Sequence, residues 1–197
     1  MKIEGLQNLT LLDYPGQVAC TLFTAGCDFR CPFCHNASLV LPGQAPEAIP
    51  EEDFFALLEK RRGVLDGVCV TGGEPTLQPD LPDFLRRVKA LGYAVKLDTN
   101  GGRPQVLRAL AEEGLVDYVA MDIKNCPDRY AETAGVPGLD LAPIRESVEF
   151  LMGGIYPSSS APPWSAPSMT RAASVPSGSG LRGKSPISSS SSRIPAT

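Results

Sequence analysis

The amino-acid sequence predicts an α/β fold, a partial (β/α) barrel with parallel strands inside and helices outside. Between residues 18 and 152, short apolar runs alternate four times with segments of helical period. Most of these apolar runs end in glycine or polar residues, and three cysteines follow the first run. Strand-then-helix units in series predict right-handed crossovers, so the carboxyl ends of the strands should meet at one edge of the sheet.

The predicted elements follow one another in a simple order. Residues 1–16 should end in a turn at Pro15-Gly16, and a strand over 18–24 then leads into the cysteines. A helix is expected over 51–62, because apolar residues recur there at helical spacing among charged ones. The remaining predicted elements are strands over 67–71, 93–97 and 117–121 and helices over 81–91, 104–114 and 141–152. No strand is expected after the last helix, so the barrel should lack its last strands.

Three cysteines, Cys27, Cys31 and Cys34, form a C-x3-C-x2-C pattern directly after the first strand. Thiolates are the usual ligands of 4Fe–4S clusters, and three of them leave the fourth iron open to bind a second molecule. The same cysteines together with His35, the only histidine, could instead form a Cys3His zinc site. The loop alone favours iron–sulfur and zinc about equally.

The other three cysteines, Cys20, Cys69 and Cys126, lie in or beside apolar strand-like runs, and we expect them to be buried core thiols. A disulfide framework is the least favoured interpretation, since no secretory signal precedes the cysteines. Unpaired cysteines are typical of a reducing compartment, so a cytoplasmic location is expected. No stretch approaches the roughly 20 apolar residues of a membrane helix, and no membrane association is expected.

Charge is distributed unevenly along the chain. All 22 acidic residues but only 14 of the 18 basic ones lie within 1–157, so this part carries a net charge of −8 against −4 for the whole chain. A surface of this sign repels phosphate backbones, which excludes nucleic acid as an expected partner.

Polar residues recur where the later strands end, and this recurrence predicts one shared site. Gly72-Gly73-Glu74-Pro75 follows the second strand, where glycine lets the main chain approach a cationic amine closely. Asp98, Thr99 and Asn100 follow the third strand and offer groups suited to ribose hydroxyls or to a small hard cation. Asp122-Ile123-Lys124 follows the fourth strand.

In this order the motifs resemble the radical SAM superfamily, and within it the activating proteins of anaerobic ribonucleoside-triphosphate reductase, which are glycyl radical enzyme activating enzymes. The resemblance covers most of 1–157 and is carried by residues 12–16, 26–36, 71–75, 96–101 and 121–124. It implies an oxidoreductase in which a 4Fe–4S cluster binds S-adenosylmethionine and cleaves it reductively to a 5′-deoxyadenosyl radical. This radical would abstract a hydrogen from the Cα of one glycine in a partner enzyme under anaerobic conditions.

The resemblance also implies roles for individual residues. The cluster ligands are Cys27, Cys31 and Cys34. The implied S-adenosylmethionine contacts are Phe33 beside the adenine, Gly72, Gly73, Glu74 and Pro75 at the amino group, Asp98 and Asn100, and Lys124 near the carboxylate. The implied ligands of a monovalent cation are Asp98, Thr99 and Asp122. The implied mechanism needs no general base, so no acid–base catalytic residue is expected.

Two partners are implied by the same resemblance: a glycine-bearing loop of anaerobic ribonucleotide reductase, and an electron donor such as flavodoxin or ferredoxin. Two alternatives stay open at this point. One is a radical SAM enzyme that acts on a small molecule, similar to 7-carboxy-7-deazaguanine synthase. The other is a metal-binding module without catalysis.

Residues 158–197 differ in composition from the rest, with 14 serines, 6 prolines and no acidic residue. Such low complexity predicts disorder. Members of the family continue instead with an Arg-Thr-Thr-Val-Val strand and a later Tyr-Phe-Leu-Gln-Gln-Phe strand. Back-translation of a family-like ending with one base deleted after Pro157 reproduces this tail, so we expect the tail to be out of frame. The core over 1–157 is then expected to be incomplete, poorly stable, and weakly active or inactive.

Overall fold

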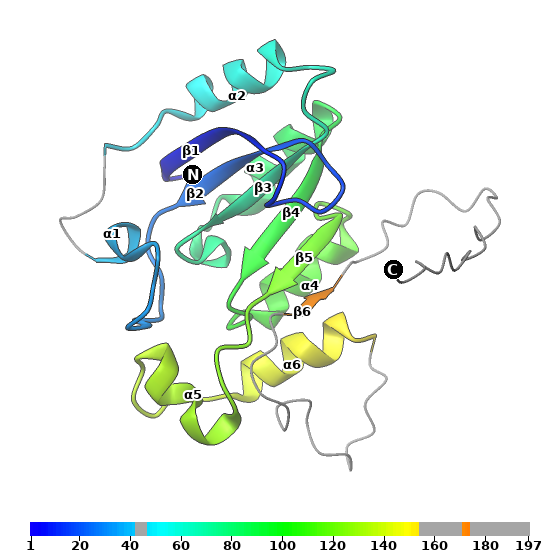
Figure 1. The fold of residues 1–197 in the computed structure, drawn as a ribbon. Helices are drawn as coiled ribbons and strands as arrows, with labels where there is room; N and C mark the ends of the chain where they lie inside the picture. Colours follow the sequence, from blue (N-terminus) through cyan, green and yellow to red (C-terminus); the bar gives the residue numbers. More distant parts are fainter. Residues whose placement is uncertain (42–46, 154–170, 174–197) are drawn as a thin grey trace, which may run out of the picture.

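A single mixed sheet organises the computed structural model, which describes residues 1–41, 47–153 and 171–173 (Figure 1). The strands lie in the order β1 Ile3–Thr10, β2 Ala19–Thr24, β3 Gly67–Gly72, β4 Ala94–Thr99, β5 Tyr118–Met121 and β6 Arg171–Ala173. Strands β2 to β5 are parallel, whereas β1 pairs with β2 and β6 with β5 in antiparallel fashion. The four parallel strands confirm the predicted arrangement.

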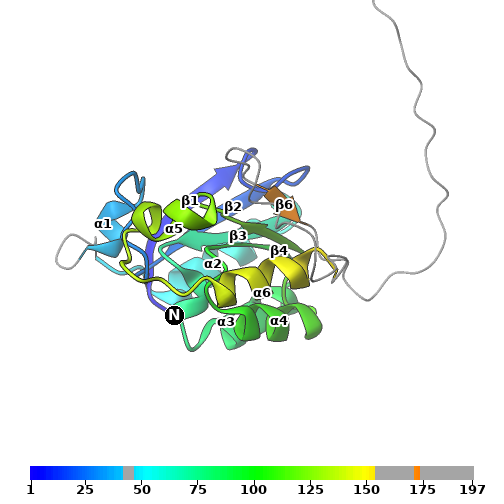
Figure 2. The ribbon, with the colours of Figure 1, turned by 90° about the horizontal axis from the view of Figure 1, so that it is seen from below.

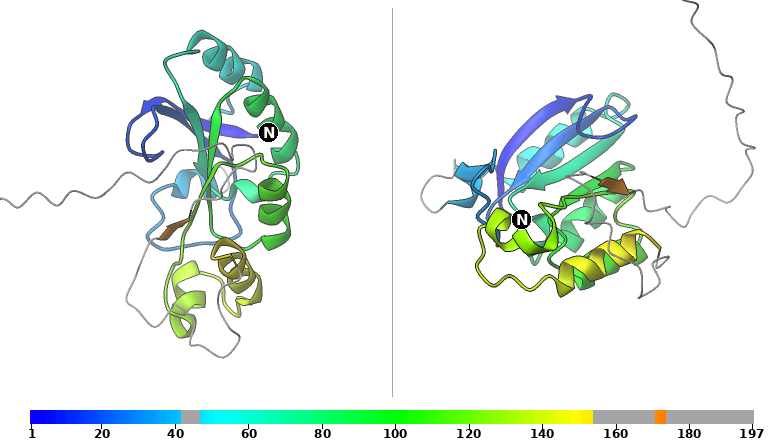
Figure 3. Two further views of the ribbon diagram at one scale, coloured as in Figure 1. Left: turned by 90° about the vertical axis from the view of Figure 1, so that its right-hand side faces the viewer. Right: turned by 60° about the horizontal axis from the view of Figure 1, so that its bottom comes forward.

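The helices that connect the parallel strands cover one face of the sheet. The helices are α1 Ala37–Val40, α2 Glu51–Lys60, α3 Leu81–Ala90, α4 Pro104–Glu112, α5 Pro127–Ala134 and α6 Ala142–Leu151, with a 3-10 helix η1 at Pro75–Leu77. Seen from below, α3, α4 and α6 lie on the same side of the strands (Figure 2). A side view shows α2, α3 and α4 stacked along that face (Figure 3). This is the outer helical layer expected for a partial barrel.

The main hydrophobic core lies between the sheet and this helical layer. Alternate residues of each strand enter it, as Val68 and Val70 do from β3 and Val95 and Leu97 from β4. The helices contribute the buried side chains Phe54, Leu58, Leu81, Phe84, Leu85, Val88, Leu107 and Leu110. Residues between these strand positions, such as Cys69 and Lys96, therefore project from the opposite face.

Strand β1 was not expected from the sequence. Its pairing with β2 carries register shifts between Ile3 and Gly5 and between Gln7 and Thr10, so no regular alternation of apolar and polar residues marks it. Helix α5 was also missed: it is short, and only Tyr130 and Ala134 of its eight residues are buried. Helix α5 lies beside the site described below.

Strand β6 corrects the expectation that no strand follows the last helix. Arg171 and Ala173 pair with Met121 and Val119, so part of the edge of β5 is covered. Because β6 is antiparallel and has three residues, it does not add the missing parallel strands, and the partial barrel is confirmed. The predicted tail otherwise lies outside the described residues, over 158–170 and 174–197.

The cysteines outside the loop fall into two groups. Cys20 and Cys69 are fully buried, as predicted, whereas Cys126 is half-buried at the start of α5, so its assignment to the core was wrong. All six cysteines are unpaired. Across the described ranges, no helix combines the length and apolar character needed to span a membrane.

Candidate active site

A cavity of about 680 Å³ opens at the carboxyl ends of the parallel strands. In Figure 1 the arrowheads of β3, β4 and β5 point toward this end, where α1 and α5 also lie. Of the predicted site residues, Cys27, Cys31, Phe33, Cys34, Gly72, Gly73, Glu74, Asp98, Thr99, Asn100, Asp122 and Lys124 line the cavity. Pro75 does not line it but is buried at the start of η1. Four chain segments therefore converge as their positions at strand ends predicted.

A small hydrophobic cluster anchors the cysteine loop to the rest of the fold. Phe29, between the first two cysteines, is buried against Met121, Tyr130 and Ile144. The Arg30 N–H donates to the carbonyl of Ala134 at the end of α5, at 2.8 Å. Helix α5, which the sequence pattern did not indicate, therefore supports the loop that carries the cysteines.

Burial disfavours the thiolate forms of Cys27 and Cys31 when no metal is bound. Burial raises the pKa of Cys27 to about 11. Burial also raises the pKa of Cys31, although the nearby charge of Lys124 acts in the opposite direction. Since metals bind the thiolate, loading this loop must release protons.

Among the described residues, no three His, Cys, Asp or Glu side chains are placed to hold a single metal ion. A mononuclear zinc site needs four ligands around one ion, whereas three cysteines on a 4Fe–4S cluster each bind a different iron. Cys27, Cys31 and Cys34 all line one cavity, where they could each bind a different iron of one cluster.

The two glycines of the Gly-Gly-Glu-Pro turn lie against the backbone at the end of β2. A Cβ on Gly73 would stand 1.8 Å from the Gly26 carbonyl oxygen, and one on Gly72 would stand 2.3 Å from the Thr24 nitrogen. The Glu74 N–H donates to that Gly26 carbonyl at 2.8 Å. Glycine is required here because the turn packs on the start of the cysteine loop.

Glu74 joins the turn after β3 to the end of β4. Its carboxylate is 1% exposed and accepts hydrogen bonds from the Thr99 hydroxyl and the Asn100 N–H, both at 2.7 Å. It also accepts from the N–H and hydroxyl of Thr76. Burial raises the pKa of Glu74, while these hydrogen bonds act in the opposite direction. Glu74 therefore holds the walls of the cavity together through bonds within the protein.

The three residues predicted to bind a cation contact other protein groups. Asp98 lies within β4 and not after it, and its carboxylate accepts from Lys96. Asp122 accepts from Lys124 at 2.9 Å, and the Thr99 hydroxyl donates to Glu74. Lys96 belongs to the segment 96–101 that carries the resemblance, but its contact with Asp98 was not predicted.

The remaining predicted residues lie around the mouth of the cavity. Phe33 is 57% exposed at the rim, and His35 also lines the cavity. Asn36, which was not predicted, donates from its side chain to the Gly72 carbonyl at 3.1 Å and so fixes the end of the loop to the glycine turn. The only signal for this role in the sequence was that Asn36 is a polar residue close after Cys34, the last cysteine of the loop.

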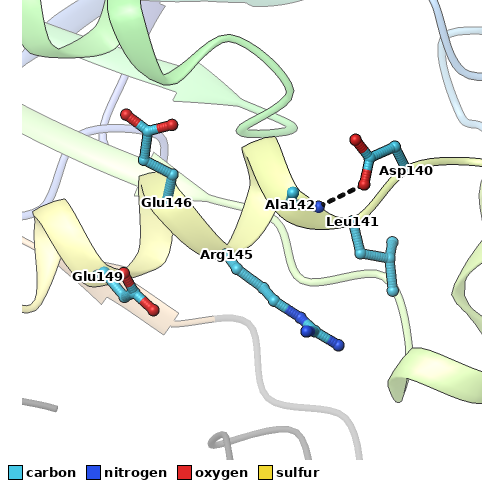
Figure 4. A pocket seen from close by; sticks show the side chains of 6 residues that line it. All are labelled: Asp140, Leu141, Ala142, Arg145, Glu146 and Glu149. Atoms are coloured by element: carbon cyan, nitrogen blue, oxygen red, sulfur yellow. Dashed lines mark hydrogen bonds between the residues drawn. The ribbon is translucent and has the colours of Figure 1, made fainter. Parts of the chain in front are cut away.

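A second hollow, of about 460 Å³, lies on the surface of α6 (Figure 4). It is lined by Asp140, Leu141, Ala142, Arg145, Glu146 and Glu149. Figure 4 shows Arg145 and Glu146 pointing away from each other, and the drawn hydrogen bond joins Asp140 to the start of the helix. Its charged groups do not converge, so the first cavity is the better candidate.

The first cavity fits the cofactors that the resemblance implies. Three thiols from one loop reach into it, and its volume lies within the range of small-molecule sites, about 300–1,000 Å³. Carboxylate, amide and ammonium groups at the ends of β4 and β5 face the space beside the thiols. A cluster on the cysteines would leave room for a polar ligand next to it.

Two curated proteins are similar in sequence to half or more of this chain. A glycyl-radical enzyme activating enzyme of Methanocaldococcus jannaschii, itself assigned by inference, is 37% identical over 134 residues, which are 66% of this chain and 53% of that protein. The 7-carboxy-7-deazaguanine synthase of Thermococcus kodakarensis is 32% identical over 120 residues, 51% of this chain and 47% of that enzyme. The chain spans about half the length of these relatives.

A solved structure has a similar fold. The crystal structure of QueE from Escherichia coli aligns over 80% of each chain with a TM-score of 0.50 and 16% identity, which concerns the fold alone. The family model described as the Radical SAM superfamily matches residues 21–153, well over half of the chain and including the whole cysteine loop. The chain therefore belongs to the radical SAM superfamily.

Proposed function

We propose that this chain is a radical SAM activating enzyme that generates a glycyl radical in an anaerobic ribonucleotide reductase. The observation that carries the proposal is the convergence of the three loop thiols with the ends of β3, β4 and β5 in one cavity. The likeness to the Methanocaldococcus jannaschii protein supports the reaction class. The substrate is inferred from the motifs in the sequence.

In this proposal Cys27, Cys31 and Cys34 hold the cluster, and the rest of the cavity holds S-adenosylmethionine. When bound, the two cofactors supply the one-electron chemistry that removes a hydrogen atom from the substrate. Lys124, whose charge is felt at Cys31, is placed beside the cluster loop and would attract the carboxylate of the ligand. Asp98 and Asn100 offer groups for the ribose, and Phe33 an apolar surface for the adenine.

In this proposal the glycine turn contacts the ligand through its backbone, and not through the Glu74 carboxylate as the resemblance implied. The Glu74 carboxylate is already bonded by four protein donors, so it orients the turn and does not itself reach the amino group of the ligand. The backbone of Gly72 and Gly73 lines the cavity and supplies the surface against which the amino group would lie. Electrons would come from a reduced flavodoxin or ferredoxin.

A second candidate is an enzyme acting on a small molecule, similar to 7-carboxy-7-deazaguanine synthase. The 32% identity to the Thermococcus kodakarensis enzyme favours it. It shares the cofactors, so the difference lies only in the substrate that loses hydrogen: a pterin in this case, a reductase glycine in the other.

Isotope transfer distinguishes the two candidates. The reconstituted protein is incubated anaerobically with reductant, S-adenosylmethionine and a reductase whose glycines carry deuterium at Cα. We expect deuterium in the 5′-deoxyadenosine and a glycyl radical signal on the reductase. A reductase with alanine at the radical glycine is the control and should transfer no label. Label taken instead from a deuterated pterin would favour the small-molecule enzyme.

A further inference from the structure

Lys96 carries a positive charge to Asp98, a residue that lines the cavity. Its side chain is 9% exposed and projects from the face of β4 opposite to that of Val95 and Leu97, which enter the helix-covered core. Its neighbour in the sheet register is Cys69 of β3, which is fully buried on the same face. A buried ammonium is costly unless it has partners, so its contacts indicate why it is there.

Lys96 and Cys69 together occupy the carboxylate of Asp98. The Lys96 ammonium donates to Oδ1 of Asp98 and, at 3.6 Å, to the sulfur of Cys69. The Cys69 thiol donates to the other oxygen, Oδ2, also at 3.6 Å. Both oxygens of Asp98 therefore have partners within the protein, and its negative charge is balanced by an ammonium.

The other residues predicted to bind a cation also have hydrogen-bond or ionic partners within the protein. The Thr99 hydroxyl donates to Glu74 at 2.7 Å and accepts from the Gly101 N–H at 3.1 Å. Asp122 has its own ammonium partner in Lys124, at 2.9 Å. Each of the two carboxylates at the ends of β4 and β5 is thus paired with a lysine of the chain. A further cation would have to displace one of them, so these contacts do not fit a bound metal ion.

We propose that the Lys96 ammonium stands in the place of a monovalent cation at Asp98, so that this protein needs neither sodium nor potassium at its site. Lys96 is then a positioning residue that fixes the Asp98 carboxylate toward the cavity. The contacts at Asp98 carry this inference by themselves; only the consequence for ligand binding rests on the proposed function.

The test compares cations at constant ionic strength on the full, anaerobically reconstituted chain. Thermal unfolding is followed in sodium, potassium and choline chloride for the wild type and for Lys96→Ala. The wild type should unfold at the same temperature in all three salts. Lys96→Ala leaves Asp98 without its cation and should unfold about 3–8 °C lower in choline chloride, a shift kept moderate because Asp98 is 32% exposed.

Rescue identifies the position as a cation site. Methylammonium, sodium or potassium should restore part of the loss in Lys96→Ala, whereas tetramethylammonium, which cannot donate a hydrogen bond, should not. Lys96→Met fills the volume without charge and should resist rescue. Lys89→Met is the matched control, because Lys89 pairs with Asp117 on the outer side and is 29% exposed.

Two results would overturn the inference. One is a wild type that sodium or potassium stabilises more than choline does, which would favour the bound cation predicted from the sequence. The other is a Lys96→Ala protein whose stability does not depend on the cation supplied. If Lys96→Ala fails to fold, the unfolding temperatures of the wild type and of Lys96→Met in the three salts still test the inference. None of these readouts requires cleavage of S-adenosylmethionine, so failure of the proposed function would be seen separately.

Discussion

The side-chain amide of Asn100 donates a hydrogen bond to the carboxylate of Asp28 at 2.8 Å, which joins the end of β4 to the cysteine loop. The Asn100 N–H also donates to Glu74, and its side-chain oxygen accepts from Gly102. One residue thus connects three of the segments that form the cavity. The position of the cysteines relative to the strand ends depends on this connection.

Asn100→Ala should loosen the cysteine loop. We expect a loss of stability of about 1–3 kcal/mol, from a hydrogen bond to a charged group and the bonds beside it, and several-fold less iron retained after desalting. Tyr93→Phe is the control, because the hydroxyl of Tyr93 bonds the carbonyl of Leu58 within the helix-covered core. An equal loss of iron in both variants would show that Asn100 has no special role.

Gly73→Ala should disrupt the turn after β3, since its Cβ would overlap the Gly26 carbonyl. We expect a loss of more than about 3 kcal/mol, or failure to fold, measured by urea unfolding. Gly92→Ala is the comparison: Gly92 has φ +89° and open space around it, so alanine there costs only backbone strain, about 1–2 kcal/mol. Equal losses at the two positions would contradict the close packing of the turn on the loop.

Glu74 should make stability depend on pH. Burial raises the pKa of Glu74 above the ordinary 4.5. At pH values between 4.5 and the raised pKa, the native state therefore binds more protons than the unfolded chain. The free energy of unfolding contributed by Glu74 therefore falls as pH rises through this range and is largest below pH 4.5.

Unfolding of the wild type and Glu74→Gln, measured between pH 4.5 and 7, checks this sign. The advantage of the wild type should shrink as pH rises. Glu113→Gln, measured below pH 4.5, should show the opposite trend, with an advantage of the wild type that grows as pH rises, since the hydrogen bond from Arg86 lowers the pKa of Glu113. A Glu74 advantage that grows with pH would mean that its hydrogen bonds outweigh burial.

The sequence-based predictions succeeded where a regular pattern repeats. Parallel strands in series bring their carboxyl ends together, so Cys27, Glu74, Asp98 and Asp122 were expected at one site and lie around one cavity. Strand β1 is bulged, and α5 is a short helix with two buried residues, so neither was predicted. The role of Glu74 was not predictable either, because Thr99 and Asn100 become its neighbours only in the folded chain.

The charge balance at Asp98 shows the same limit. Along the sequence Lys96 is one polar residue in an apolar run, and its contact with Asp98 depends on both side chains leaving the same face of β4. Spacing of two residues permits this contact but does not specify it. Burial of Lys96 against Cys69 of the neighbouring strand specifies its contact with Asp98.

The tail gives a prediction that concerns the gene as well as the protein. If residues 158–197 are out of frame, restoring one base near Pro157 should add parallel strands beyond β5 and raise the thermal unfolding midpoint. The restored protein should also cleave S-adenosylmethionine faster than this chain. Equal stability and cleavage in the two proteins, or a gene without a one-base shift, would refute the prediction.

The central claim is that three cysteines of one loop hold an iron–sulfur cluster, and metal content tests it most directly. Iron, sulfide and zinc are measured after anaerobic reconstitution in six single Cys→Ala variants. We predict about four irons per chain in the wild type and in the variants of Cys20, Cys69 and Cys126, and loss of iron in those of Cys27, Cys31 and Cys34. Zinc in place of iron, or iron that survives removal of a loop cysteine, would contradict the account.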